Sequence, residues 1–276
     1  MKWKQFLTPI KSINTDKARE FMKDKTSNDL MFLDVRQPKE YEEGHIAGAR
    51  LIPLPELNSR LHEIDPQKST VVYCAIGGRS RIAAQLLAGR GFENVINLSG
   101  GFKAWNGETA VGDELQGLEL FSGDESPEQT LAIAYSLEDG LRDFYISMAS
   151  IVQNKSAIDL FKKLADIEVK HQDKIYSEYK NITEGSLSRE DFINSNVADT
   201  IEGGLTTEEY VSRFNPDWES VKDITGIAMS IEAQALDLYL RMSQKNSHSK
   251  SKKALEQLAD DERDHLKALG KLIENL

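Results

Sequence analysis

The hydrophobic pattern of the chain changes near residue 107. Before that point, short apolar runs alternate with helical patterns, which predicts an α/β domain with a parallel sheet. The runs at 30–33, 70–73 and 95–98 are the expected strands, and 15–25 and 80–88 are the expected helices.

The second part has the periodicity of four long amphipathic helices, at about residues 127–152, 156–181, 217–245 and 249–274. Ser126, Pro127 and Gln129 match a helix start, with a capping serine, proline at the first helical position and glutamine three residues after the cap. About 35 residues separate the second and third helices, with a short helical pattern near 207–213. The pattern predicts a four-helix bundle with a long crossover between its second and third helices.

Charge divides the chain at the same place. Residues 1–107 carry a net charge of +4 and the remainder −15, within a total of −11. Residues 108–128 include seven acidic side chains and no basic one. We therefore expect a domain over residues 1–107, an acidic linker over 108–126 and the bundle over 127–276.

The overall acidity argues against nucleic acid and against an anionic membrane as partners. No apolar run approaches the roughly 20 residues that span a bilayer, and the first ten residues lack the apolar core of a signal peptide. We therefore expect a cytoplasmic protein.

The bundle contains an internal repeat. A shift of 94 residues pairs 12 identical residues within the 40 positions from Ala132 to His171, so a helical hairpin is used twice. Each hairpin has a glutamate on its first helix and Glu-x-x-His on its second, 30 residues later. These six residues are Glu138, Glu168 and His171 in the first hairpin, and Glu232, Glu262 and His265 in the second.

The six polar residues interrupt the apolar stripes of their helices at one height. In an α-helix, Glu138 and Glu168 would both lie roughly 20 Å from the turn that joins their helices. Four buried carboxylates without counter-charge are strongly unfavourable, and two divalent cations would neutralise them. A single Glu-x-x-His is common on solvated helices, but its repetition with a matching glutamate predicts a di-metal site. Iron and manganese suit these ligands, and the pattern does not exclude zinc.

From about Glu128 to the C-terminus the chain resembles the ferritin-like superfamily, particularly its rubrerythrin-like branch. The resemblance implies two iron ions held by the six residues, with Glu168 and Glu262 bridging, and a homodimer. Tyr145 and Tyr239 follow their glutamates by seven residues and are expected either to donate hydrogen bonds to the ligands or to pack in the core. Ala235 stands where some relatives carry an extra glutamate. A rubredoxin-like domain needs four cysteines and this chain has one, so we expect an external electron donor.

The single cysteine, Cys74, lies between a predicted strand and a predicted helix. Backbone N–H groups before a helix N-terminus favour a thiolate, and Arg79 is expected to lower the pKa of the thiol further. A phosphatase loop would need five residues between cysteine and arginine, whereas this loop has four. A buried structural cysteine is the other alternative, and the glycines of the loop argue against it. The loop consists of Cys74, Ala75, Ile76, Gly77, Gly78 and Arg79.

The first 107 residues resemble the rhodanese family. The motifs at 33–36, 40–49, 74–79 and 100–105 occur in the family's order and spacing. The resemblance implies a sulfurtransferase in which Cys74 accepts sulfane sulfur and passes it to a nucleophile, with Arg79 as a catalytic partner and residues 75–79 binding the substrate. We expect a structural ion pair between Asp34 and Arg36, and a loop-closing hydrogen bond from His45.

Together these features predict a sulfurtransferase that works through a Cys74 persulfide, fused to a non-haem di-iron oxidoreductase that handles sulfide, persulfide or peroxide. The expected partners are a small sulfur-containing donor and a thiol or another nucleophile as acceptor. Ala75 and Ile76 are apolar where some thiosulfate-using rhodaneses are basic, so a persulfide is an alternative donor to thiosulfate. The alternative function is a non-catalytic persulfide carrier or sensor with an iron-binding bundle for storage.

Overall fold

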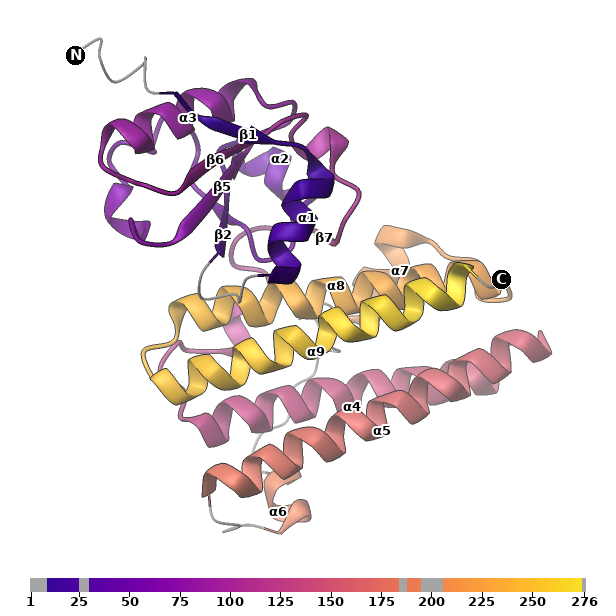
Figure 1. The fold of residues 1–276 in the computed structure, drawn as a ribbon. Helices are drawn as coiled ribbons and strands as arrows, with labels where there is room; N and C mark the ends of the chain where they lie inside the picture. The colour runs from indigo at the N-terminus through magenta and orange to yellow at the C-terminus, as the bar shows by residue number, and fades with distance from the viewer. Residues whose placement is uncertain (1–8, 25–29, 184–187, 195–205, 275–276) are drawn as a thin grey trace. The chain divides into compact units, whose positions relative to one another are not determined.

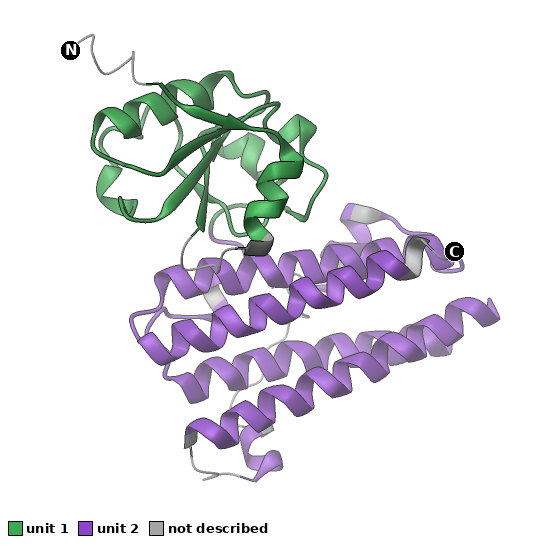
Figure 2. Cartoon of the chain, in the orientation of Figure 1, with its two compact units in different colours: residues 1–114 green, residues 115–276 purple. Residues whose placement is uncertain are grey.

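The computed structural model describes residues 9–24, 30–183, 188–194 and 206–274, and the chain divides into two compact units. Met1–Glu114 form the first unit and Leu115–Leu276 the second (Figures 1 and 2). Each unit has its own core, so each is described separately. None of the helices described combines the length and the apolarity that crossing a bilayer requires.

The first unit contains the predicted parallel sheet. Its strands lie in the order β1 (Lys11–Ile13), β6 (Val95–Leu98), β5 (Ser69–Tyr73), β2 (Leu30–Asp34) and β4 (Arg50–Leu51), and every neighbouring pair is parallel. The three central strands are the predicted ones. The edge strands β1 and β4 have only three and two residues, which is too short for a recognisable hydrophobic pattern.

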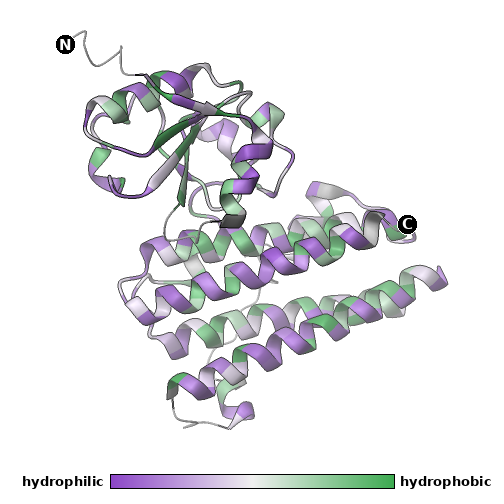
Figure 3. Ribbon diagram, viewed as in Figure 1, coloured by the Kyte–Doolittle hydropathy of each residue, from purple (hydrophilic) through white to green (hydrophobic). Residues whose placement is uncertain are grey.

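Successive strand residues point to opposite faces of the sheet, so each face has its own apolar cluster. Leu33 and Val72 face α3 (Gly78–Gly89), while Phe32 and Val71 face the other side. That other side is covered by α1 (Thr15–Asp24) through Ala18 and by α2 (Pro38–Glu42) through Tyr41. In Figure 3 the strands are accordingly among the most hydrophobic segments of this unit. Cys74 belongs to the cluster on the α3 face, directly after β5.

The second unit is the predicted four-helix bundle. Its long helices are α4 (Pro127–Ile151), α5 (Lys155–Thr183), α8 (Val221–Lys245) and α9 (Ser249–Glu274). The long crossover includes α6 (Arg189–Asn194) and α7 (Thr207–Phe214), of which only α7 was predicted. The residues that the structure describes also include the 3₁₀ turns η2 (Leu61–Glu63), η3 (Phe102–Ala104) and η4 (Leu118–Leu120).

The bundle begins at the predicted capping box. Ser126 Oγ accepts the N–H of Gln129 at 3.3 Å, and Gln129 Oε1 accepts the N–H of Ser126 at 3.0 Å. Inside the bundle an apolar cluster joins α4 and α5 to α8, through side chains such as Leu141, Phe161 and Ile231. The capping box fixes where α4 starts, and the apolar cluster fixes which face of each helix turns inward.

The predicted acidic linker is partly built into both units. β7 (Thr109–Ala110) pairs antiparallel with β3 (His45–Ile46) in the first unit. In the second unit, Phe121 is buried and the carboxylate of Glu125 accepts N–H groups from Gly123 and from the side chain of Asn246. The pairing of β7 with β3 and the bond from Asn246 join residues that are far apart in the sequence, so the composition of the segment does not reveal them.

Candidate functional sites

The Cys74 loop is held with its backbone N–H groups turned toward the sulfur. The N–H of Gly77, whose φ is 100°, donates to Cys74 Sγ at 3.1 Å. The carbonyl oxygens of Cys74 and Ala75 point the other way and accept the N–H groups of Phe102 at 2.8 Å and Lys103 at 3.0 Å. A glycine at 101 permits this approach, because a Cβ there would clash with the Cys74 carbonyl oxygen. The loop is therefore preorganised as a cradle for a negative charge on sulfur.

Ser80 contributes a hydroxyl group behind the same sulfur. Its Oγ lies 3.6 Å from Cys74 Sγ and 2.7 Å from Asn97 Oδ1, and Asn97 Nδ2 donates to Ser12 at 3.2 Å. Burial of Cys74 alone would raise the pKa of its thiol. The N–H and hydroxyl groups of Ser80, with the N–H groups of Ile76 and Gly77, outweigh burial and lower that pKa below its ordinary value. The sequence analysis did not assign a role to Ser80.

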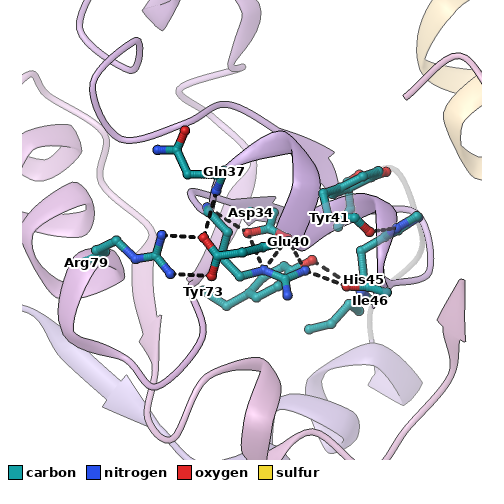
Figure 4. A network of polar contacts seen from close by, with 11 residues as sticks. Asp34, Gln37, Glu40, Tyr41, His45, Ile46, Tyr73 and Arg79 are labelled. Carbon is teal, nitrogen blue, oxygen red and sulfur yellow. Dashed lines mark hydrogen bonds and ion pairs between the residues drawn. The ribbon is translucent and has the colours of Figure 1, made fainter. Parts of the chain in front are cut away.

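Arg79 makes a contact that the sequence did not indicate. Its guanidinium forms a two-pronged ion pair with Glu40 of α2, with Nη1–Oε2 at 2.7 Å and Nη2–Oε1 at 2.6 Å (Figure 4). The hydrogen bond from Arg79 is the largest influence on Glu40 and lowers the pKa of that carboxyl to about 2. The groups that lower the pKa of the Cys74 thiol most are the backbone N–H groups and Ser80. Arg79 also interacts with Cys74, because the charge of Cys74 raises the pKa of Arg79 after the larger influence of Glu40. The expected effect of Arg79 on the thiol stays a prediction.

Asp34 and Arg36 form the structural ion pair that was expected. Both are buried, and Arg36 Nε and Nη2 lie 2.9 Å and 2.7 Å from Asp34 Oδ2. Arg36 also donates to the carbonyl oxygen of Gly44 at 2.7 Å, while His45 Nδ1 lies 3.0 Å from the carbonyl oxygen of Tyr41. These bonds hold the segment after α2, and with it the helix that carries Glu40, against the ion pair of Asp34 and Arg36.

The structure brings the six predicted metal ligands together as two groups of three. Glu138, Glu168 and His171 form one group, and Glu232, Glu262 and His265 form the other. Within each group, one ligand atom from every residue lies within 4.8 Å of the others. Among the described residues, these are the two groups of three or more histidine and acidic side chains with this spacing.

The two groups have nearly the same geometry, as the repeat predicts. His171 Nδ1 lies 3.3 Å from Glu138 and 2.7 Å from Glu168, and His265 Nδ1 lies 3.3 Å from Glu232 and 3.0 Å from Glu262. The two imidazole rings stack with centroids 3.5 Å apart, so the groups meet across the bundle.

The donor set fits two divalent cations. All four carboxylates are at most 2% exposed, and burial raises the pKa of Glu168. Within the described part of the chain, Glu168 Oε1 is buried and has no hydrogen-bond partner. A buried oxygen of this kind is unfavourable unless a cation takes the place of the missing donor. Carboxylate oxygens and imidazole nitrogens are suitable ligands for iron.

The surroundings of the two groups differ. In the first hairpin, buried Gln172 bonds Asp139 at 2.9 Å and Arg142 at 3.2 Å, beside the ligands. The positions 94 residues later are Ala233, Leu236 and Leu266, all buried and apolar. Tyr145 and Tyr239 are fully buried on α4 and α8, and their role as hydrogen-bond donors to the ligands stays a prediction.

Comparison with known proteins gives two family matches. A model described as a rhodanese-like domain matches residues 15–108, and one described as rubrerythrin matches residues 129–273. The thiosulfate sulfurtransferase GlpE of Ectopseudomonas mendocina is 34% identical over 112 residues, which are 39% of this chain and 99% of that protein.

Two Bacillus subtilis proteins are also similar to the first unit. The uncharacterized protein YqhL is 49% identical over 76 residues, 28% of this chain and 60% of YqhL. The putative sulfur carrier protein YrkF is 39% identical over 92 residues, 33% of this chain and 50% of YrkF. The chain thus spans between half and two thirds of the length of these two relatives.

Proposed function

Because this chain belongs to the rhodanese-like and rubrerythrin families, with a rhodanese-like sulfurtransferase domain fused to a rubrerythrin domain, we propose that it moves sulfane sulfur through Cys74 and carries out redox chemistry at a di-iron centre in its bundle. The observation that supports the first activity most directly is the ring of N–H and O–H donors around Cys74 Sγ. The second rests on the two buried groups of three ligands.

The sulfur-transfer reaction has two displacements. The Cys74 thiolate attacks the outer sulfur of the donor, the sulfur–sulfur bond of the donor breaks, and its remainder leaves with that bond's electron pair. A persulfide then remains on Cys74, where the N–H of Gly77 and the other donors of the loop hold its negative charge. A thiolate or another nucleophile next attacks the terminal sulfur, and the Cys74 thiolate leaves.

In the bundle, one ion would be held by Glu138, Glu168 and His171 and the other by Glu232, Glu262 and His265. Iron bound there supplies electron-transfer chemistry toward sulfide, persulfide or peroxide. The protein's own residues exclude bulk water, since the carboxylates are buried, and they balance the charge of the cations. An external protein or small reductant would deliver electrons, because this chain has one cysteine and a rubredoxin-type site requires four.

The sulfur-transfer proposal is tested by the Cys74→Ala variant. The wild-type protein should convert an alkyl persulfide or thiosulfate and a thiol acceptor into products, and the variant should lose this activity completely. Transfer that is unchanged in the variant would contradict the proposal. Uptake of one sulfur atom by Cys74 without onward transfer would also contradict it and would favour a carrier.

The metal proposal is tested by anaerobic titration with ferrous iron. We expect about two ions per chain. The double variant Glu168→Ala, Glu262→Ala should bind none, whereas the variant Asp166→Asn, Asp260→Asn provides a matched control at exposed positions of the same helices. Binding of about two ions per chain by the Glu168→Ala, Glu262→Ala variant would show that these glutamates are not the ligands.

A further inference from the structure

At the entrance to the Cys74 loop, the positive charge of Arg79 is balanced by a carboxylate. Arg79 is the one basic side chain of loop 74–79, and both Nη atoms of its guanidinium contact Glu40. Arg79 also interacts with Cys74, but Glu40 has the larger influence on its pKa. Both side chains are about one third exposed, so the pair stands at the surface beside the sulfur rather than beneath it. Figure 4 shows the two groups facing each other.

The pair persists through the range of pH in which the protein would work. The pKa of Glu40 is lowered to about 2, so this carboxylate remains ionised down to acidic pH. Its Oε2 also accepts the N–H of Gln37 at 3.1 Å, which fixes it at the start of α2. Glu40 is thus anchored from two sides and holds Arg79 in a defined position.

The remainder of the entrance offers apolar contact. Ile76 is 69% exposed and Ala75 precedes it, while the backbone carbonyls of the loop are already bonded to Phe102 and Lys103. The neighbouring basic side chains of Arg81 and Lys103 are solvent-exposed, where water and salt screen their charge. A doubly charged donor therefore finds little unbalanced positive side-chain charge here, whereas an organic donor finds an apolar side chain.

We propose that Glu40 is a specificity-determining residue, which neutralises Arg79 and thereby selects sulfane-sulfur donors of low charge, such as alkyl persulfides, over dianions such as thiosulfate. This inference rests on the proposed sulfur transfer. With an alkyl persulfide, the Cys74 thiolate and R–S–SH give the Cys74 persulfide anion and R–SH, the proton passing to the leaving thiolate. With thiosulfate the leaving group is the sulfite dianion, and charge is likewise conserved.

The experiment is the substitution Glu40→Gln, with Glu42→Gln as the matched control. Glutamine at position 40 can still cap α2, so the fold of the helix is retained, while Arg79 is released from its counter-charge. Glu42 lies on the same helix and its side chain is exposed. Its substitution makes the same change in net charge but leaves the ion pair between Glu40 and Arg79 in place.

We expect Glu40→Gln to raise kcat/KM for thiosulfate by about five-fold and to leave kcat/KM for an alkyl persulfide within about two-fold. Glu42→Gln should change neither value. The comparison is the ratio of kcat/KM for thiosulfate to kcat/KM for the alkyl persulfide. The proposal is overturned if this ratio in Glu40→Gln equals that of the wild type or is smaller.

A second measurement does not depend on turnover. Sulfate is an unreactive dianion, and its protection of Cys74 against iodoacetamide reports anion binding at the loop, with no other cysteine to interfere. Glu40→Gln should lower the sulfate concentration for half-protection by about five-fold, and Arg79→Gln added to it should remove this gain. If no donor supports sulfur transfer, the proposed function fails, but the sulfate measurement still tests the role of Glu40. Equal protection by sulfate in Glu40→Gln and in the wild type would reject the proposed role of Glu40.

Discussion

At the scale of single residues, the chemistry of Cys74 depends on neighbours that have no charge. Ser80 has one hydroxyl proton and two acceptors within reach, the sulfur of Cys74 and the amide oxygen of Asn97. A thiolate attracts that proton more strongly than a thiol does, because hydrogen bonds to ionised groups are stronger. The serine can therefore respond to the charge on the sulfur without any movement of the backbone.

Ser80→Ala should raise the pKa of the Cys74 thiol, because the variant loses a donor that lowers it. The pH dependence of iodoacetamide alkylation measures this pKa directly, since Cys74 is the sole cysteine. The midpoint should move to higher pH, because hydrogen bonds to an ionised group favour the ionised form. Ser59→Ala, at an exposed position of the same unit, should leave it in place. An unchanged midpoint in Ser80→Ala would show that the hydroxyl bonds Asn97 alone.

The sequence was sufficient to identify Cys74 and the six bundle ligands as candidates. The glycines beside Cys74 are a local signal, and the repeat with its constant interval can be read from the sequence without a structure. The sequence was not sufficient for Glu40 and Ser80. The partners Glu40 and Arg79 are 39 residues apart and meet only because α2 and the Cys74 loop pack at one end of the sheet. Charge alone gave Arg79 a role toward the sulfur, and only the fold shows which carboxylate it contacts.

At the scale of helices, each long helix of the bundle carries an ionisable group where its apolar stripe faces the core. On α5, Leu164 precedes Glu168 and Ile175 follows it, and all three are buried. Such a position is unfavourable for a carboxylate in the metal-free protein, as the raised pKa of Glu168 also indicates. The helix therefore gives up stability in order to present a ligand.

Glu168→Gln should stabilise the metal-free protein while weakening metal binding. Glutamine removes the buried charge and keeps a polar group of similar shape, so the free energy of unfolding should rise by about 1–3 kcal/mol. After removal of metal with a chelator, urea denaturation monitored by far-UV circular dichroism measures this change. Asp166→Asn removes the same charge from an exposed position of α5 and should have little effect. Destabilisation by Glu168→Gln would indicate that the carboxylate is favourable even without metal.

The elements that the sequence predicted poorly are the short ones. The four long helices follow from periodicity over many turns, whereas α6 has six residues and forms because Phe192 packs against Tyr135 and Tyr179. The same applies to β7 and η4, which lie inside the predicted acidic linker. Their existence depends on distant partners, and a local pattern contains no information about these.

At the scale of the whole molecule, two units with separate cores should respond separately to metal. A ligand that binds only the folded bundle stabilises it by about 2.7 kcal/mol at a concentration one hundred times its Kd. Manganese or anaerobic ferrous iron should therefore raise the Tm of residues 115–276 and leave that of residues 1–114 unchanged.

Two probes distinguish the units during heating. Circular dichroism at 222 nm is dominated by the bundle, while the loss of sulfur transfer through Cys74 on heating reports unfolding of the first unit. With Glu168→Ala and Glu262→Ala combined, metal should shift neither transition. A metal-dependent shift in the temperature at which sulfur transfer is lost would contradict the separate response.

The repeated hairpin also has a consequence for how the di-metal site can be assembled. Each half contributes one complete set of three ligands, and the two sets meet where His171 stacks on His265, so neither half encloses a cation pair by itself. Cleavage of the peptide chain within the crossover should therefore yield two fragments that reassociate by complementation. Binding of the metal ions should favour this reassociation.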